Sequence, residues 1–545
     1  MAIPKFQLDR KRNVIAIFGE IPNEAEKTFT AQGYSCKEIP PSITPENIWF
    51  QQVDSIIILQ DARQPKRAVD FLVQFSQTLL ATDCRIYFRC ATQEVVLSRL
   101  QMRELVIDAI TTHELPAIRL SSTDRERLGS WSIVADLPEL CPYVDISEDK
   151  EDWAMLSSRI LHNPSGNLPA AALDIQALDT NKRKIDLPSE VTLLLKRAFD
   201  DCRKIELEEI GHGKSEAKAY RAFAKLQKSH LGDAWPYQYF VKIGKRSVIA
   251  KEYLNYRDTV LDQIPFHLGP RLREERCVLG CKLGVMVSDY VSNADALSEI
   301  AKSGQAGAAV SSLLLHTVGA WRNGDSAEKE DIKEFLLSIF PKGGIPDFRL
   351  PLVEKLGHKP THDDLHNTLN RYSSSPTLVG VIHGDMHAKN ILVRGHDAIL
   401  VDFEKLQKRS PVLHDIASIE AGLLDDCFYN DGRTAAELHS FLKPLYCYYA
   451  FSQDHPKEAP PTPGHWYFQD VRFIRTQAKS LERQNLQYAW MLAVVMLKKA
   501  CKDENLDEIH AQWGDKPKGL SAENVRAVMY VLAAELINSL PTVKE

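Results

Sequence analysis

The segment 381–404 concentrates carboxylate, amide and imidazole side chains between short apolar runs. Asp385 and Asn390 stand five residues apart, and Asp402 follows twelve residues after Asn390. In phosphoryl transfer, one carboxylate accepts the proton of the attacking hydroxyl, while a second carboxylate and an amide oxygen hold Mg²⁺ against the triphosphate. The types and spacing of these residues therefore indicate phosphoryl transfer chemistry.

Short β-strands must position these side chains. Apolar, β-branched runs predict a strand before Gly384 and further strands at 391–393 and 398–403, with a hairpin turn at 395–397. The turn 384–390 then lies at the ends of buried strands. We expect its polar residues to project from a rigid base.

The motifs of this segment resemble those of the protein-kinase-like phosphotransferases, and they are most similar to the aminoglycoside phosphotransferase and choline kinase branch. Residues 383–390 read HGDMHAKN, which fits the loop H-G-D-x-H-x-x-N of that branch. Residues 402–404 read DFE, a variant of the kinase D-F-G. Residues 413–417 read LHDIA and fit the trailing D-[LI]-A element, whose aspartate braces the catalytic loop. The resemblance covers residues 195–500.

The resemblance implies a role for each matching residue. Asp385 is the expected catalytic base, and Asn390 and Asp402 are the expected metal ligands. Glu404 is an auxiliary metal or substrate contact, and His383 holds the loop by hydrogen bonding. The implied cofactors are ATP and Mg²⁺, and the implied acceptor is a hydroxyl of a small molecule or of a protein side chain.

Two other functions stay open on the residues alone. His383, Asp385 and His387 occupy alternate positions and could belong to a metallohydrolase cluster, although that function leaves Asn390 without a role. The other alternative is a nucleotide-binding pseudokinase that acts as a sensor or interaction module. The intact base and metal residues argue against this second alternative.

The region before the segment predicts a nucleotide-binding lobe. Gly211 and Gly213 form a small-residue turn that resembles an imperfect kinase glycine loop. Lys242 lies in the middle of a predicted strand and is expected to pair with the nucleotide phosphates, with Glu252 on the following helix as its ion-pair partner. A hinge that contacts adenine through the backbone is expected around Ser288 and Tyr290, by order along the chain.

Downstream of the hinge, residues 306–321 predict a helix, and residues 322–377 are expected to form a solvated insertion. Residues 473–499 carry the longest helical pattern. Aromatic residues gather in the C-terminal part and favour core packing over a cage for a cationic substrate, namely Tyr446, Tyr448, Tyr449, Phe451, Trp466, Tyr467 and Phe468.

The N-terminal region alternates strand and helix patterns, which favours a parallel sheet with helices on both faces. Strands are expected at 13–18, 53–59 and 84–90, and helices at 23–32, 66–80 and 94–109. The pattern resembles a receiver-like (flavodoxin-like) domain that serves regulation or docks a protein partner. Asp61 is the one candidate phosphate acceptor, and because a single acid binds Mg²⁺ poorly, we do not expect Asp61 to be phosphorylated.

The expected architecture is therefore an α/β N-terminal domain followed by an α+β two-lobed kinase-like domain with a helix-rich C-lobe. The expected boundaries are 1–120 for the receiver-like domain, 121–190 for a connector, 191–292 for the N-lobe and 293–545 for the C-lobe.

Composition sets outer limits on function. The chain has 545 residues, 44% of them hydrophobic, and a net charge of −6. These values are ordinary for a globular protein and give no overall basic field, so nucleic acid is not an obvious partner. No apolar run approaches the roughly 20 residues that a membrane-spanning helix needs. The ten cysteines show no disulfide framework, and we expect a cytoplasmic protein.

Overall fold

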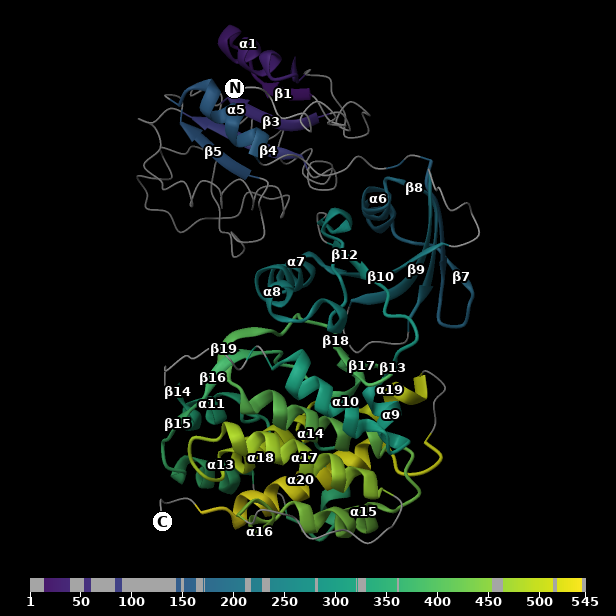
Figure 1. The fold of residues 1–545 in the computed structure, drawn as a ribbon, viewed down its shortest axis with the longest axis vertical. Helices are drawn as coiled ribbons and strands as arrows, with labels where there is room; N and C mark the ends of the chain where they lie inside the picture. Colours follow the sequence, from purple (N-terminus) through teal and green to yellow (C-terminus); the bar gives the residue numbers. More distant parts are fainter. Residues whose placement is uncertain are drawn as a thin grey trace. The chain divides into compact units, whose positions relative to one another are not determined.

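The computed structural model describes residues 14–39, 53–59, 84–90, 144–148, 151–162, 170, 172–210, 217–227, 236–279, 283–319, 321, 330–359, 362–452, 464–512 and 517–541. The chain divides into two units, whose helices and strands are labelled in Figure 1. The first unit comprises Met1–Tyr253 and Leu272–Tyr290, and the second comprises Leu254–Arg271 and Val291–Glu545.

A parallel sheet opens the first unit. Its strands pair in the order β2-β1-β3-β4-β5, all parallel. Their bounds are Val14–Phe18 (β1), Ser35–Glu38 (β2), Val53–Leu59 (β3), Arg85–Cys90 (β4) and Val144–Glu148 (β5). This order is one of the two common orders of doubly wound sheets. Strand β3 reads VDSIIIL and is buried over nearly its whole length, as expected for a strand covered on both faces.

Among the described residues of this domain, two helices belong to the sheet, α1 (Asn23–Ala31) and α5 (Trp153–His162), and they pack against each other. Phe29 on α1 meets Trp153 on α5 edge to face, with 6.1 Å between ring centroids. The strands and the helix that the sequence predicted at 13–18, 53–59, 84–90 and 23–32 are present as β1, β3, β4 and α1. The predicted helices at 66–80 and 94–109 and the residue Asp61 lie outside the described residues.

The expected boundary at residue 120 and the connector 121–190 are wrong. Strand β5 pairs with β4 in parallel register, Ile86 opposite Val144, and α5 joins the same core. The sequence VDISE of β5 has no continuous apolar run, so only its pairing with a distant strand defines it. Elements of the second sheet also begin inside the expected connector.

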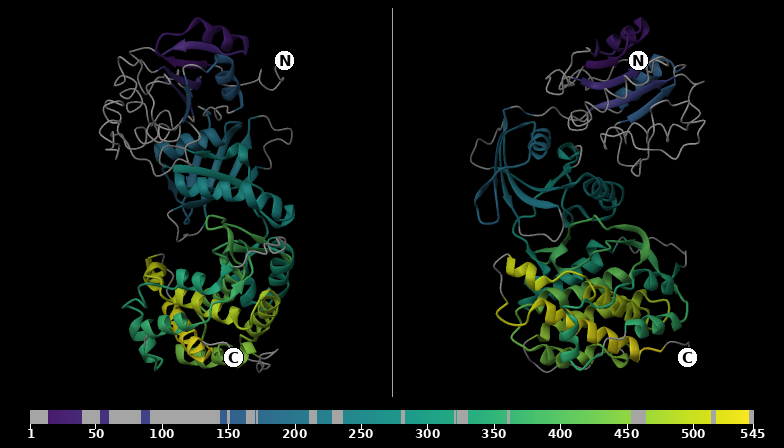
Figure 2. Two further views of the ribbon diagram at one scale, coloured as in Figure 1. Left: turned by 90° about the vertical axis from the view of Figure 1, so that its left-hand side faces the viewer. Right: turned by 180° about the vertical axis from the view of Figure 1, so that it is seen from behind.

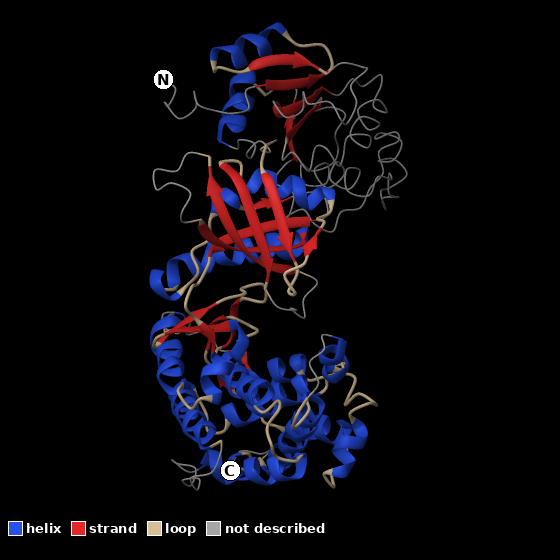
Figure 3. Cartoon of the chain, turned by 90° about the vertical axis from the view of Figure 1, so that its right-hand side faces the viewer, coloured by secondary structure: helices blue, strands red, loops and turns tan. Residues whose placement is uncertain are grey.

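The second sheet of the first unit is mostly antiparallel. Its order is β11-β12-β10-β9-β8-β6-β7, and only β6 and β8 run parallel. The bounds are Asp174–Leu178 (β6), Lys184–Ile185 (β7), Cys202–Glu209 (β8), Lys218–Leu226 (β9), Tyr237–Lys245 (β10), Val278–Leu279 (β11) and Leu283–Asp289 (β12). Figure 3 shows these strands in red beside the helices of the unit. The second sheet therefore begins at residue 174, before the start of the N-lobe that was expected at residue 191.

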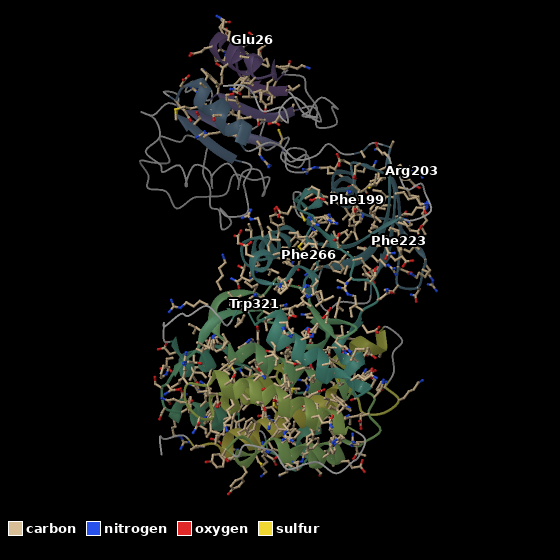
Figure 4. The ribbon with its side chains drawn as sticks, in the orientation of Figure 1. Glu26, Phe199, Arg203, Phe223, Phe266 and Trp321 are labelled. Atoms are coloured by element: carbon tan, nitrogen blue, oxygen red, sulfur yellow. The ribbon has the colours of Figure 1, made fainter. Side chains whose placement is uncertain are left out.

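Two helices position this sheet. Helix α6 (Ser189–Ala198) packs on β12 and contributes Leu194 and Leu195 to its core. Phe199, labelled in Figure 4, follows α6 and meets Tyr239 of β10 at 5.8 Å between ring centroids. Helix α7 (Arg246–Asn255) starts directly after β10, so the last strand residues and the first helical turns are fixed together.

The second unit is rich in helices, as Figure 2 shows from two sides. Its helices include α9 (Leu297–Lys302), α10 (Ala306–Ser312), α11 (Ile332–Ile339), α12 (Leu350–Lys355), α13 (His362–Arg371), α14 (Leu413–Cys427), α15 (Ala435–Leu442), α16 (Tyr448–Ser452), α17 (His465–Leu481), α18 (Gln487–Ala500), α19 (Leu506–Gln512) and α20 (Ala522–Ser539). Helices α14, α18 and α20 pack against one another and are buried over most of their length. They form the centre of the unit. No described helix is both long and apolar enough to cross a membrane.

Two sequence expectations for this unit need correction. The long helical pattern at 473–499 is split into α17 and α18. Glu482 is extended after the end of α17, and Leu486 adopts a left-handed conformation with φ 71° before α18. The region 322–377 is no solvated insertion where it is described, since α12 and α13 pack on α20 and α11 packs on α18. Leu336, Val353 and Leu365 are fully buried there.

Two small antiparallel sheets of the second unit carry the segment singled out by its sequence. One pairs β16 (Val379–Ile382) with β19 (Gln407–Pro411), and the other pairs β17 (Ile391–Arg394) with β18 (Asp397–Leu400). The second pair is the predicted hairpin. The loop His383–Asn390 therefore connects one sheet to the other.

Candidate active site

Gly384 sets the shape of the loop between β16 and β17. Its φ is +77°, in the left-handed region that favours glycine. A Cβ added there would lie 2.2 Å from the carbonyl oxygen of Lys405. The glycine of the HGD motif is therefore required by both conformation and space.

Helix α14 braces this loop at its first turn. Asp415 accepts hydrogen bonds from the backbone N–H of His383 at 2.6 Å and of Gly384 at 3.0 Å. The carboxylate is buried, with 6% of the residue exposed, so charge-assisted bonds of this kind are strong. The structure thus contains the brace that the LHDIA motif led us to expect.

The other end of α14 holds the loop a second time. Asp426 lies 3.0 Å from Lys389 Nζ and 3.7 Å from His387 Nδ1. Between the two ends, Gly422 lets the helix approach closely, since a Cβ at that position would lie 3.0 Å from the Cβ of His387. Contacts along one helix therefore fix both the start and the end of the loop.

His383 cannot act as a metal ligand in this arrangement. Its ring is fully buried, Nε2 donates to Val401 O at 3.0 Å, and Nδ1 accepts the N–H of Asp385 at 3.3 Å. Burial lowers the pKa of His383, which keeps the ring neutral, as this bonding pattern requires. Among the described residues, no group of three or more His, Cys, Asp or Glu side chains could hold a metal ion. The metallohydrolase alternative therefore loses its cluster.

Asp385, the expected base, forms an ion pair that sequence reasoning missed. Lys405 Nζ lies 2.6 Å from Asp385 Oδ2. Burial alone would raise the pKa of Asp385, but the hydrogen bond from Lys405 and nearby positive charges outweigh burial and lower that pKa. Lys405 follows the DFE motif directly, and no feature of the sequence points from it to a residue twenty positions earlier.

The hairpin of β17 and β18 brings the two expected metal ligands to its open end. Asn390 ends the loop before β17, and its backbone oxygen accepts the N–H of Val401 at 3.0 Å. The side-chain amide of Asn390 donates to Asp385 O at 3.1 Å, which leaves its Oδ1 directed away from that bond. Asp402, next to Val401, has φ 67°, a conformation that costs energy in a residue other than glycine.

Residues of the second unit also fix Phe403 beside Asp402. The side-chain amide of Asn255 donates to the backbone oxygens of Phe403 at 2.9 Å and of Glu404 at 3.2 Å. The ring of Phe403 meets that of Tyr256 at 5.8 Å and that of His383 at 5.4 Å. The DFE turn is thus held from two sides.

In the first unit, Lys242 and Glu252 form an ion pair of 2.7 Å between Nζ and Oε2. Lys242 stands on β10, the third strand of the antiparallel run β8-β9-β10, and Glu252 on the helix α7 that follows. Both residues are buried, at 6% and 2% exposed. A lysine on the third strand paired with a glutamate on the next helix is the arrangement that protein kinases use.

The other residues expected to contact a nucleotide are less favourably placed. Ser288 is buried and pairs with Phe240 across β10 and β12. The N–H of Tyr290 already donates to Gln238 O at 3.4 Å, and Arg221 covers the ring of Tyr290 at 4.6 Å. Any adenine contact at this point would use other backbone groups. Gly211 and Gly213 lie outside the described residues.

Some of the aromatic residues of the C-terminal part lie beside a buried cation of the chain. Tyr446 and Tyr467 are buried, and Arg475 lies over the rings of Phe451 at 4.0 Å and Tyr446 at 5.3 Å. Arg475 also pairs with the buried Glu420 at 2.6 Å. Tyr446 and Tyr467 therefore pack in the core, as expected, whereas Tyr449 is 68% exposed. The cation beside these rings is a residue of the chain itself.

One comparison with known protein families matches a region that contains the loop His383–Asn390. A family model described as "Ternary complex associated domain 9" matches residues 359–494. No curated protein matches the sequence. Among solved structures, the aminoglycoside phosphotransferase APH(4)-Ia aligns at 12% identity and TM-score 0.35, over 63% of this chain and 98% of that chain.

Two further solved structures have similar scores. Amicoumacin kinase in complex with AMP-PNP, Ca²⁺ and Ami aligns at 13% identity and TM-score 0.33, over 61% of this chain and 89% of that chain. Plasmodium vivax ethanolamine kinase aligns at 9% identity and TM-score 0.31, over 61% of this chain and 81% of that chain. At these identities and TM-scores, likeness carries no function over to this chain.

Proposed function

We propose that the chain is an ATP- and Mg²⁺-dependent kinase-like phosphotransferase that moves the γ-phosphoryl group to a hydroxyl. The observation that carries the proposal is the braced loop: Asp415 fixes the backbone that presents Asp385, and the adjoining hairpin sets Asn390 and Asp402 at its open end. A carboxylate and an amide oxygen are ligands that Mg²⁺ accepts, with its remaining positions left for waters and phosphates.

Each residue then has a distinct task. Asp385 orients the acceptor hydroxyl and takes its proton. Asn390 and Asp402 would hold Mg²⁺, which when bound neutralises charge on the transferred phosphoryl group. Lys242, kept in place by Glu252, would pair with nucleotide phosphates, and the backbone around Ser288 and Tyr290 would face adenine. Gly211 and Gly213 belong to the same proposal as a phosphate-covering turn.

The pseudokinase alternative has one observation in its favour, the Asp385–Lys405 ion pair, which occupies the carboxylate that a hydroxyl would need. A sensor that binds nucleotide without turnover could keep this pair permanently. An enzyme must open the pair when the acceptor binds. Turnover is therefore the measurement that separates the two functions.

The test compares Asp385→Asn and Asp402→Asn in the full chain. A positioned base contributes about 10²- to 10⁴-fold in rate, so we expect Asp385→Asn to lose ADP release by that factor and to keep Mg²⁺–nucleotide binding. Asp402→Asn should raise the Mg²⁺ concentration needed for binding and also slow the reaction. Nucleotide binding in the wild type without Asp385-dependent ADP release would favour the sensor.

For the N-terminal parallel sheet we propose a receiver-like regulatory or docking role for a protein partner. Its strand order supports this class of fold. The test is deletion of residues 1–169, which respects the position of β5 and α5. We expect ADP release to persist while its regulation is lost, and loss of soluble protein from this deletion would contradict a separate role.

A further inference from the structure

Lysine side chains gather around the proposed base. Lys405 Nζ lies 2.6 Å from Asp385, and its side chain is 54% exposed. Lys498 and Lys499 occupy the last turn of α18, a helix that packs directly on α14. Lys499 Nζ lies 4.0 Å from Asp425 Oδ2 and, like Lys405, helps to lower the pKa of Asp385.

Lys498 has no counter-ion in the described part of the chain. Its side chain is exposed, and no hydrogen bond or ion pair of its ammonium group is found there. Burial of part of the side chain and the charges of Lys405 and Lys499 lower the pKa of Lys498, while Asp385 raises it. Lys498 therefore lies within electrostatic reach of both Asp385 and Lys405.

The acidic residues nearby are already engaged. Asp426 pairs with Lys389 at 3.0 Å, and Asp425 lies 3.3 Å from the buried Arg526. Asp385 pairs with Lys405, and Asp402 is assigned to the metal in the proposed function. Glu404, whose negative charge also acts on Lys405, is the auxiliary metal or substrate contact expected there. What remains available to a ligand on the α18 side of Asp385 is positive charge, which opposes a cationic acceptor and favours an anionic one.

We propose that the phosphoryl acceptor is an anionic alcohol, whose phosphate or carboxylate group binds Lys498 and Lys405 so that its hydroxyl faces Asp385. This inference rests on the proposed phosphotransferase function. Binding of the anion would draw Lys405 away from Asp385 and free the carboxylate. The acceptor oxygen then bonds to the γ-phosphorus, the bond to the bridging oxygen of ADP breaks, ADP leaves, and the hydroxyl proton passes to Asp385.

A nucleotide phosphate is a weaker explanation for these lysines. In the proposed function the nucleotide already has Lys242 and the Asn390–Asp402 metal site to neutralise its phosphates. Lys498 belongs instead to the helix layer formed by α14 and α18. Saturating the protein with Mg²⁺·AMP-PNP therefore separates the two explanations experimentally.

The test is lysine footprinting of the full chain saturated with Mg²⁺·AMP-PNP. Reductive methylation of each lysine is followed by mass spectrometry while inorganic phosphate, acetate or chloride is added at matched ionic strength. We expect phosphate or acetate to protect Lys498 and Lys405, whereas chloride should not. Lys355, exposed in the last turn of α12, is the matched control and should stay reactive.

Two variants make the result specific. Lys498→Gln should weaken protection of Lys405, and Lys405→Gln should weaken protection of Lys498, each by about tenfold in half-protecting concentration, because bonds to charged groups contribute that much. Lys355→Gln should change neither. Protection by phosphate alone would identify a phosphorylated acceptor, and protection by acetate as well would extend the site to carboxylates.

Different results would contradict the anionic acceptor and the phosphotransferase function. Equal protection of Lys355, or no protection of Lys498 while nucleotide is bound, would overturn the anionic acceptor and leave the phosphotransferase intact. Failure to bind Mg²⁺·AMP-PNP would instead count against the proposed function itself, before any anion is added.

Discussion

The two units each contain a lysine–carboxylate pair of nearly equal length in very different surroundings. Lys242 and Glu252 lie 2.7 Å apart with side chains 8% and 3% exposed, while Lys405 and Asp385 lie 2.6 Å apart with side chains 54% and 31% exposed. Removing one partner of a buried pair leaves an uncompensated charge, whereas water screens an exposed pair. Distance alone therefore does not rank these pairs. The first pair is buried beside its sheet, whereas water reaches both side chains of the second.

The largest effect is expected from Glu252→Gln in the first unit. Leaving Lys242 buried without its counter-charge should lower the free energy of unfolding by about 3–5 kcal/mol. Chemical denaturation monitored in the full chain measures this loss. The matched control is Glu208→Gln, since the Lys182–Glu208 pair at 2.8 Å is 61% and 24% exposed and should matter by less than about 1 kcal/mol. Equal losses in the two variants would break the comparison.

Asp470 extends the comparison of the two pairs to a third carboxyl group, which is buried. Its Oδ2 has no hydrogen-bond partner among the described residues. Burial raises the pKa of Asp470 from 3.8 to about 7. Between these values the folded state keeps a proton that the unfolded state releases, so stability falls as pH rises from about 4 to about 7.

The variant Asp470→Asn removes this titration. We expect it to match the wild type near pH 4 and to exceed it at pH 8 by about 2–4 kcal/mol, since each pKa unit corresponds to about 1.4 kcal/mol. Denaturation curves across this pH range give the difference. A difference that does not change with pH would show that Asp470 has a partner in solution.

Asp415→Asn tests a buried carboxylate that is bonded to backbone instead of to a cation. One of its two acceptor oxygens becomes an NH₂ group that faces a backbone N–H, so the loss should be about 1.5–3 kcal/mol. Hydrogen exchange at the amides of His383 and Gly384 should accelerate, while exchange in α20 follows only the global stability. Unchanged exchange at both amides would mean that Asp415 does not hold the loop.

The smallest change in stability is expected from Lys405→Gln. Because the pair with Asp385 is half exposed, its loss should alter the free energy of unfolding by less than about 1 kcal/mol. Thermal or chemical denaturation beside Glu252→Gln measures the contrast directly. A loss as large as that of the buried pair would show that the Asp385–Lys405 pair is structural.

The sequence located the loop and its brace because their parts are close together in the chain. The HGD, DFE and LHDIA motifs fall within 383–417. Their glycine and aspartates are the residues that the local backbone geometry requires, so a short motif is enough to identify them. The Lys242–Glu252 pair was also within reach of sequence reasoning, since a strand and the next helix are adjacent. Strands β1, β3 and β4 were found by their apolar runs.

What escaped sequence reasoning depends on contacts between distant segments. Strand β5 has no apolar run of its own, and its pairing with β4 alone makes it part of the sheet. The break between α17 and α18 lies between the extended Glu482 and the left-handed Leu486, and the helical pattern of the sequence does not show it. Helices α12 and α13 look solvated in sequence because their buried residues are few, yet those few face α20.

By itself, the sequence of this protein determined the local geometry of the proposed catalytic loop, because glycine, aspartate and asparagine impose their conformations and hydrogen bonds over a few residues. Only the tertiary structure decided which charges surround Asp385. Lys405, Lys498 and Lys499 reach its neighbourhood from a turn and a helix end that the packing of α18 on α14 brings together. Electrostatic interactions act through space, so no spacing along the chain could have revealed them.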